Sequence, residues 1–476
     1  MKQIIIYSLF AFAIGMTSCN DFLTEEPILS QSNELTLGSY DGLNKATAAA
    51  YGYLYDDTWY GAGFVLSSEL RSGNAKNPTD TDFTSGRYIN EYGWSYSSSS
   101  TSYLWGYAYA AIAAANNVIN NLEGKETSDV TAADLNNLRA ECLFIRALSH
   151  FDLLRTYAQP YTHAPNSPGV PIVLITELGK PARNTVSEVY DQIVADLLEA
   201  ESKMQDDYKR SNVTDVFAAA TKPAIQGLLS RVYLYMGEWQ KAADYATKVI
   251  NSGKFNMFTA DELPYIWTQN TASAGGEVIF EIFGLLSNEY NPYWEEISGM
   301  TTPFGYADVM SSADLRNLYE DDDVRLSLFE SDPDAPEDHL WTTKYWGKAT
   351  ERPTYNNIIV LRLSEMYLNR AEALFRGASI AGASVASDLL AITSNRGASP
   401  VTPSLAGILT ERRKELAFEG HILYDMARNG MAVNRTVDYD GPSTAQYIEF
   451  PSFRWALPIP LSEINANPNC IQNEGY

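Results

Sequence analysis

The densest run of charged side chains lies between positions 411 and 430, and its spacing is helical. Glu411, Glu415 and Glu419 recur every four residues among several arginines. Two carboxylates that face each other across a sugar can hydrolyse a glycosidic bond. On one continuous helix, these three would instead follow one another along a single face. We therefore expect them to form ion pairs that stabilise a fold, with arginines of the same stretch or of neighbouring helices.

Other patterns that would indicate catalysis or a bound metal are weak. No two of the four histidines have the i, i+4 spacing of a helical metal pair, and Cys142 and Cys470 lie far apart in unrelated contexts. A bridge between these two cysteines stays open. The acidic run Glu320–Asp323 could bind calcium through oxygen ligands, or it could be a solvated loop. We expect a protein that is not an enzyme and has no cofactor, with calcium as an open alternative.

Aromatic residues beside polar ones point to ligand binding. The chain has 31 tyrosines and 9 tryptophans against 18 phenylalanines, so most of its rings carry a polar end. A flat ring covers the apolar face of a sugar, while amide, carboxylate or guanidinium groups bond to its hydroxyls. Two loop-like regions combine both kinds of side chain. The candidate ligand-binding residues are Arg71, Asn90, Tyr92 and Trp94 in the first region and Tyr290, Tyr293 and Trp294 in the second.

The elements that would hold these loops are helices. Apolar periodicity and two capping boxes, at Thr131 and Thr185, predict helices between about positions 42 and 201, interrupted by a loop over about 56–101. Residues 222–250 predict a helical hairpin with its turn at Gly237, spaced like a tetratricopeptide repeat. Residues 277–281 alternate like a strand. We predict a mainly α fold: a tetratricopeptide-like helical-hairpin scaffold with long loop-rich insertions and few short strands.

The N-terminal residues predict a lipoprotein signal. Lys2 is followed by an apolar run over 4–14 and by small residues that lead to Cys19, so we expect removal of residues 1–18 and lipidation of Cys19. Residues 19–40 would be a tether and 41–476 one domain. Within it we expect a helical core at about 41–255 and 355–430, a loop-rich insertion at about 256–354 and a C-terminal turn region at 431–476. The net charge of −25 disfavours nucleic acid as a partner.

These motifs, in this order, resemble the SusD/RagB family of Bacteroidetes outer-membrane lipoproteins, and the resemblance covers the chain from Cys19 to its end. The segments that carry it are CNDFL from Cys19, RALSHFDLLRTY from Arg146, SRVYLYMGEW from Ser230, RLSEMYLNRAEA from Arg362, the stretch from Glu411 to Gly430, and the ending from Leu457 to Tyr476.

The resemblance implies a glycan-binding lipoprotein on the cell surface. Its membrane contact would be the N-terminal lipid alone. It would capture oligosaccharide or polysaccharide by aromatic stacking and deliver it to a SusC-like TonB-dependent transporter in the outer membrane. In the family, ligand aromatics come from the loop before the helix of Trp105 and from the second-half insertion, so Trp94 and Tyr290 or Trp294 are the nearest counterparts. Two alternatives stay open: a peptide-binding lid of the same kind of transporter, and a glycan-processing enzyme.

Overall fold

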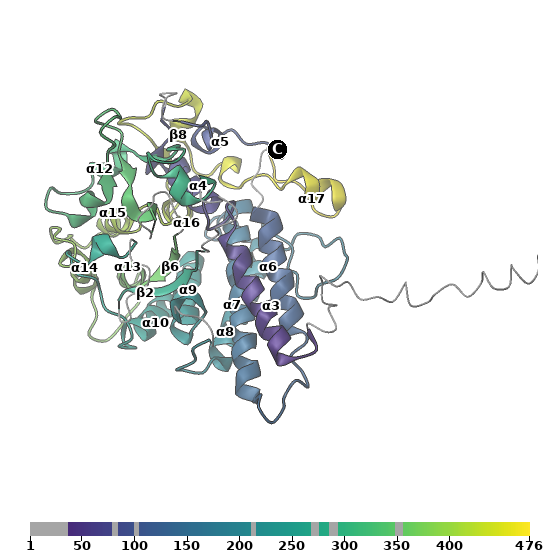
Figure 1. Ribbon diagram of the computed structural model, residues 1–476. Helices are drawn as coiled ribbons and strands as arrows, with labels where there is room; N and C mark the ends of the chain where they lie inside the picture. The colour runs from purple at the N-terminus through teal and green to yellow at the C-terminus, as the bar shows by residue number, and fades with distance from the viewer. Residues whose placement is uncertain are drawn as a thin grey trace, which may run out of the picture.

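The computed structural model describes residues 37–78, 84–99, 104–210, 216–267, 276–284, 294–347 and 356–476. Cys19, Tyr290 and Tyr293 lie outside the described residues. The fold is mainly α-helical with a few short strands, which confirms the predicted class (Figure 1). No helix in the described ranges is both long and apolar enough to cross a membrane.

The helices of the scaffold pack on one another in sequence order. Each makes its main contacts with the next, from α3 through α6, α7, α8, α9, α10 and α13 to α14, and the long helices α3, α6 and α7 run side by side in Figure 1. Their bounds are α3 Tyr40–Gly52, α6 Leu104–Ile119, α7 Ala132–Tyr157, α8 Val186–Lys203, α9 Lys222–Met236, α10 Trp239–Ile250, α13 Leu363–Phe375 and α14 Val385–Thr393.

Local sequence signals explain where these helices begin and end. Both predicted capping boxes are present, Thr131 with Asp134 and Thr185 with Glu188, so the first backbone N–H groups of α7 and α8 have acceptors. The predicted hairpin turn is present too. Gly237 ends α9 with φ +75°, a left-handed conformation that glycine adopts without strain.

Two helices, the longer α4 and the one-turn α5, lie inside the region predicted as a loop over about 56–101. Helix α4 spans Gly63–Ser72 and packs on α16, Ile422–Arg428. Eight of its ten residues are buried, among them the polar Ser68, Glu69 and Arg71, so its polar residues do not mark an exposed face as they do in an amphipathic helix. The short helices of the remaining chain are α5 Ile89–Tyr92, α11 Ile297–Met300, α12 Ala313–Arg316 and α17 Leu461–Ala466.

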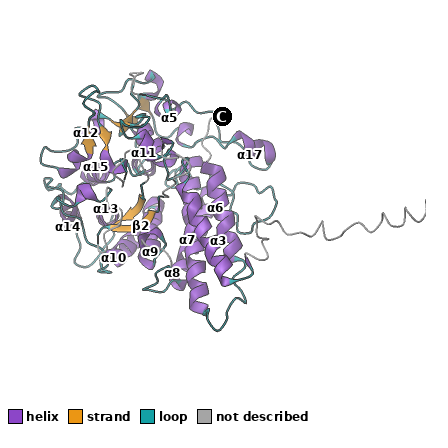
Figure 2. Cartoon of the chain, in the orientation of Figure 1, coloured by secondary structure: helices purple, strands orange, loops and turns teal. Residues whose placement is uncertain are grey.

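The described strands form antiparallel pairs and no larger sheet (Figure 2). The longest pair joins β2, Val278–Ile282, to β6, Ile358–Arg362, and confirms the strand predicted near 277–281. Every residue of β2 and β6 is buried, because helices and loops cover both faces. The other pairs are β1 Ala75–Lys76 with β3 Met310–Ser311, β4 Phe329–Glu330 with β5 Trp341–Thr342, and β7 Val433–Asn434 with β8 Tyr447–Ile448.

The charged stretch at 411–430 is not one continuous helix, and that part of the prediction is wrong. Helix α15, Leu405–Glu415, ends before a turn, and α16 starts only at Ile422. Phe418 and Gly420 in the turn have φ of +62° and +78°, which break the helical path. The turn sends Glu419 toward Lys344 and Arg362 rather than along the helix face.

The expectation that these carboxylates form ion pairs is confirmed, but with partners from distant segments. Glu415 contacts Arg362 at 2.5 Å, Arg396 at 2.8 Å and Arg325 at 2.9 Å, and its side chain is 1% exposed. Burial raises the pKa of the Glu415 carboxyl, but the Arg396, Arg362 and Arg325 guanidiniums together lower it well below its usual value. Glu411 pairs with Arg325, and Glu419 with Lys344 and Arg362. We call this cluster the buried ion network.

Candidate ligand pocket

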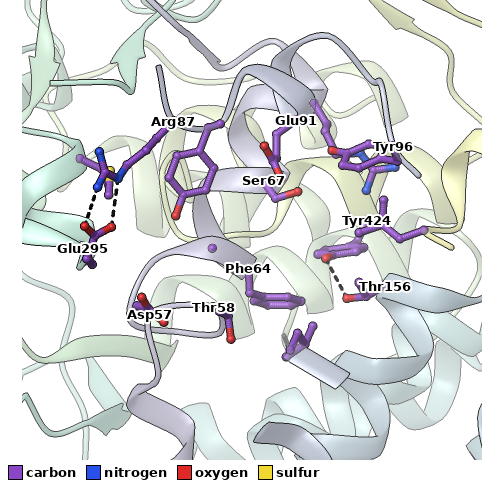
Figure 3. A pocket seen from close by; sticks show the side chains of 16 residues that line it. Asp57, Thr58, Phe64, Ser67, Arg87, Glu91, Tyr96, Thr156, Glu295 and Tyr424 are labelled. Carbon is purple, nitrogen blue, oxygen red and sulfur yellow. Dashed lines mark hydrogen bonds and ion pairs between the residues drawn. The ribbon is translucent and has the colours of Figure 1, made fainter. Parts of the chain in front are cut away.

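A pocket of about 260 Å³ lies between α4, the loop that leads into α5, and the segment that precedes α11 (Figure 3). In Figure 3, Arg87 and Glu295 lie on one side of it and Tyr96 and Tyr424 on the other. Its lining combines rings, hydroxyls, carboxylates and guanidiniums: Asp57, Thr58, Gly63, Phe64, Ser67, Arg71, Arg87, Tyr88, Glu91, Tyr96, Leu104, Thr156, Glu295, Met300, Tyr424 and Leu457.

The loop over residues 84–88 is held in place by one buried carboxylate. Asp308 accepts hydrogen bonds from Thr84 Oγ1 at 2.5 Å, from the backbone N–H of Ser85 at 2.9 Å and from that of Gly86 at 3.1 Å, and also from Ser85 Oγ. Asp308 itself is 0% exposed. Because it belongs to the second half of the chain, it fixes a first-half loop across the molecule.

The two loop-like regions singled out in the sequence meet at Arg87. Its guanidinium binds both oxygens of Glu295, and it lies 3.7 Å from the centroid of the Tyr306 ring. Trp294, beside Glu295, packs edge-on against Tyr306 with centroids 5.4 Å apart. Trp294 therefore supports the wall of the pocket through Tyr306 and does not line the pocket.

The four candidates of the first region occupy different places. Trp94 is 3% exposed, donates from Nε1 to the Arg71 carbonyl at 3.0 Å and packs edge-on against Trp455. Tyr92 is 5% exposed and donates its hydroxyl hydrogen to Asp440 at 2.8 Å. Asn90 is exposed outside the pocket, and of the four only Arg71 lines it. So little ring surface of Trp94 or Tyr92 is open to a sugar.

The rings that do line the pocket are neighbours of those candidates. Tyr88 and Tyr96 come from the same loop, and Tyr424 comes from α16. Arg71 lies between rings, 4.3 Å from the centroid of Trp94 and 5.3 Å from that of Tyr96. Composition pointed to this loop, but no periodicity in it distinguishes a ring that lines the pocket from one that packs behind it.

The pocket carries partly compensated negative charge. Burial raises the pKa of the Asp57 carboxyl to about 6, with smaller contributions from the Asp56 and Glu295 carboxylates. Burial also raises the pKa of Glu91, while Arg71 opposes that shift. Arg71 Nη2 donates to the carbonyl of Arg454 at 2.9 Å, and its buried Nε has no hydrogen-bond partner among the described residues. Carboxylates, a guanidinium and hydroxyls around rings suit a ligand rich in neutral hydroxyl groups.

The two ends of the acidic run considered for calcium, Glu320 and Asp323, are engaged in ion pairs. Asp323 contacts Arg325 at 2.7 Å and Lys414 at 2.9 Å, and Glu320 contacts Lys414 at 2.7 Å. In the ranges that the structure describes, no group of three or more histidine, cysteine or acidic residues could hold a metal ion. Cys142 and Cys470 are buried free thiols.

Comparison with known proteins gives the family. A model described as SusD-like, starch-binding and associating with the outer membrane matches residues 21–234, and the SusD family model matches residues 336–476. A SusD superfamily protein from Bacteroides thetaiotaomicron is 33% identical with a TM-score of 0.81, over 91% of this chain and 99% of that one. The chain belongs to the SusD/RagB family.

Two further relatives extend the comparison. The SusD-like protein P2 of Formosa agariphila is 26% identical, over 97% of this chain and 98% of that protein. Surface glycan-binding protein A from Bacteroides thetaiotaomicron, solved in complex with laminarihexaose, shares the fold with a TM-score of 0.73 at 20% identity, over 91% of this chain and 99% of that one. The SusD/RagB fold is therefore shared along nearly the whole chain.

Proposed function

We propose that this SusD/RagB protein is a non-enzymatic, lipid-anchored glycan-binding protein of the cell surface, and that the pocket of Figure 3 is its glycan site. The observation that carries the proposal is the lining: three tyrosine rings surround a space that also holds hydroxyls and partly compensated carboxylates. Rings pack on the C–H face of a sugar, and the carboxylates accept hydrogen bonds from its hydroxyls.

The pocket is largely preformed, which favours capture of a ligand. Asp308 holds the loop, the Arg87–Glu295 pair closes one wall, and Arg71 is fixed between Trp94 and Tyr96. A site whose side chains are already ordered loses less conformational entropy when a ligand binds. Tyr88 and Tyr96 would stack on sugar rings, with Trp94 supporting Arg71 and Tyr96 from behind.

Delivery to a SusC-like TonB-dependent transporter is part of the proposal. The family match and the lipoprotein signal predicted over residues 1–18, before Cys19, support it. The bound glycan would pass from the pocket to the transporter barrel while the lipid holds the protein at the outer membrane.

The test is binding of the purified protein to a broad panel of glycans, measured by titration calorimetry. We expect at least one neutral oligosaccharide to bind, and Tyr96→Ala to weaken it by about 1–3 kcal/mol, as for loss of an aromatic anchor. Tyr447→Ala is the matched control, because that tyrosine is 59% exposed in β8, outside the pocket. Binding of peptides but of no glycan would decide for the peptide-binding lid, and turnover of a glycan would decide for the enzyme.

A further inference from the structure

A second cavity lies at the C-terminal side of the domain, and it shares no lining residue with the pocket. It is an open groove of about 620 Å³. Three separate stretches of chain form it: residues 159–168 with Arg183, residues 451–456, and residues 472–474. We call it the Phe453 groove, after the aromatic residue in its wall.

Two consecutive residues of one segment line the pocket and the Phe453 groove. Leu457 lines the pocket, while its neighbour Ala456 lines the Phe453 groove. The segment is fixed to the scaffold, because the Leu457 backbone N–H donates to the Thr156 carbonyl at 2.9 Å. One short segment thus contributes to the wall of each cavity.

One aromatic ring in the groove, that of Phe453, is placed so that a sugar could stack on it. Phe453 is 44% exposed and lines the groove. Its ring is supported from within the protein: it lies so close to Gly475 that a Cβ there would come within 2.4 Å of it, and Tyr476 packs edge-on at 5.3 Å. A supported ring with open surface can bind a sugar face without first being ordered.

The polar groups around Phe453 are mostly neutral. Gln159, Ser167, Gln472 and Asn473 contribute amides and a hydroxyl, His163 contributes an imidazole and Glu474 a carboxylate. The side-chain N–H groups of Gln472 and Asn473 already donate to backbone carbonyls, so a sugar hydroxyl would donate to side-chain oxygens such as that of Asn473. Gln159 Nε2 donates to the backbone carbonyls of Ser452 at 3.2 Å and Phe453 at 3.4 Å, which fixes this amide against the segment that carries the ring.

The one guanidinium in the groove is already engaged. Arg183 donates to the backbone carbonyls of Gly169, Ile471, Tyr157 and Pro168 at 2.7 to 3.3 Å. Its hydrogen bonds hold the walls together and leave little capacity for an anion. Neutral hydroxyl-rich ligands therefore fit the groove better than phosphates or sulfates do.

We propose that the Phe453 groove is a second carbohydrate site, which binds one or two neutral sugar units of the polymer that also occupies the pocket. This inference rests on the proposed function and adds a second point of contact. Two linked contacts on one polymer raise the apparent affinity well above that of either alone, provided that the polymer can reach both. Short fragments that fill only the pocket gain nothing from the groove.

The test compares Phe453→Ala with Phe375→Ala. Phe375 is also 44% exposed, at the end of α13, and lines neither cavity, so it controls for loss of a surface ring. Each protein is run in native gels that contain amylose, laminarin, xylan, mannan or galactan, and is titrated with the matching short oligosaccharide. We expect Phe453→Ala to bind the polymer about tenfold or more weakly than Phe375→Ala does, with unchanged affinity for the short fragment.

The variant Tyr96→Ala separates failure of this inference from failure of the proposed function. We expect it to keep weak polymer binding, which Tyr96→Ala combined with Phe453→Ala loses. If Phe453→Ala and Phe375→Ala bind every polymer alike while Tyr96→Ala abolishes binding, the second site is rejected and the pocket stands. If the unaltered protein binds no polymer, both proposals are rejected. If only Phe453→Ala abolishes binding, the groove stands and the pocket assignment is rejected.

Discussion

The Arg87 guanidinium binds both oxygens of the Glu295 carboxylate, with Nε–Oε2 at 3.0 Å and Nη2–Oε1 at 2.6 Å. The two residues are 208 positions apart in the chain. Each comes from one of the two regions that the sequence marked for ligand binding. The pair therefore joins two loops into one wall of the pocket.

The first prediction concerns that pair. Glu295→Gln removes the charge that orients Arg87, so we expect glycan affinity to fall by about 1 kcal/mol while stability changes by less than about 1 kcal/mol, as is typical for a partly exposed ion pair. Glu199→Gln is the matched control, because the Arg139–Glu199 pair has a similar exposure of 33% and 41% but lies elsewhere. Equal glycan affinity in both variants, measured by calorimetry, would contradict a role of this pair in binding.

The second prediction concerns the loop that Asp308 holds. Asp308→Asn replaces charge-assisted hydrogen bonds by weaker neutral ones, so we expect a more mobile loop and a glycan affinity about five- to tenfold lower. Hydrogen exchange of residues 84–88 should speed up in the same variant. Asp314→Asn is the control, since Asp314 also holds a loop, through Thr436 and Val437. A loss of affinity in both would indicate a general effect on the fold.

The third prediction concerns the buried ion network. Glu415→Gln leaves three buried guanidiniums without their shared counter-charge, so we expect the free energy of unfolding to fall by about 3–5 kcal/mol. Glu320→Gln should cost less than about 1 kcal/mol, because the Glu320 side chain is 45% exposed. Urea denaturation measures both. The two variants should bind glycan normally under conditions in which they are folded, and a specific loss of binding in Glu415→Gln would argue for a role at the ligand site.

The fourth prediction concerns pH. Burial raises the pKa of Glu69 in α4 to about 7 from 4.5, although its carboxylate accepts hydrogen bonds from Asn74 and from the Gly420 backbone. Between pH 4.5 and 7 the folded state keeps a proton that the unfolded state has lost. Stability from this group therefore falls as pH rises through that window, by up to about 3 kcal/mol.

Glu69→Gln removes this titrating group. The test therefore measures the free energy of unfolding of the unaltered protein and of the variant at several pH values. The free energy of unfolding of the unaltered protein, minus that of the variant, should decrease as the pH rises from 5 to 8. Other groups titrate too, such as His150, whose pKa burial lowers to about 3, and they cancel in the difference. A constant difference across that range would show that Glu69 does not titrate as stated.

The fifth prediction distinguishes a structural role of Trp94 from direct contact between Trp94 and the ligand. Trp94→Ala opens a cavity behind Arg71, so we expect a loss of about 3–5 kcal/mol of stability, with weaker glycan binding as a secondary effect. Trp294 is only half-buried, and Trp294→Ala should destabilise less. Thermal unfolding and calorimetry on the same samples distinguish the two effects. Full stability of Trp94→Ala with strongly reduced affinity would restore Trp94 as a direct ligand contact.

Elements that depend on local signals could be predicted from the sequence. The capping boxes at Thr131 and Thr185 and the left-handed Gly237 turn need only a few neighbouring residues, and all three are present. Helix α4 could not be found in this way, because its near-complete burial erases the amphipathic pattern. The break between α15 and α16 was missed because Glu419 turns toward Arg362 and Lys344, which lie far away in the sequence.

The pocket shows the same limit at the level of single side chains. The rings of the first loop look equivalent in the sequence, and only tertiary contacts distinguish them. Trp94 is drawn inward by Trp455 and Tyr92 by Asp440, both from the C-terminal region. Tyr88 and Tyr96 then remain to line the pocket. Sequence reasoning can thus identify the loop that lines the pocket, while the orientation of Tyr92 and Trp94 depends on partners more than 300 residues away.

The buried ion network also imposes an order on the folding of the chain. Arg362 contacts Glu277, Glu415 and Glu419 at one centre, so that centre cannot form until the chain up to Glu419 is available to fold. The helices from α3 to α10 depend on contacts between neighbours in the chain and can assemble earlier. A chain that ended before Glu415 would leave Arg362 and Arg396 without the carboxylate that they share.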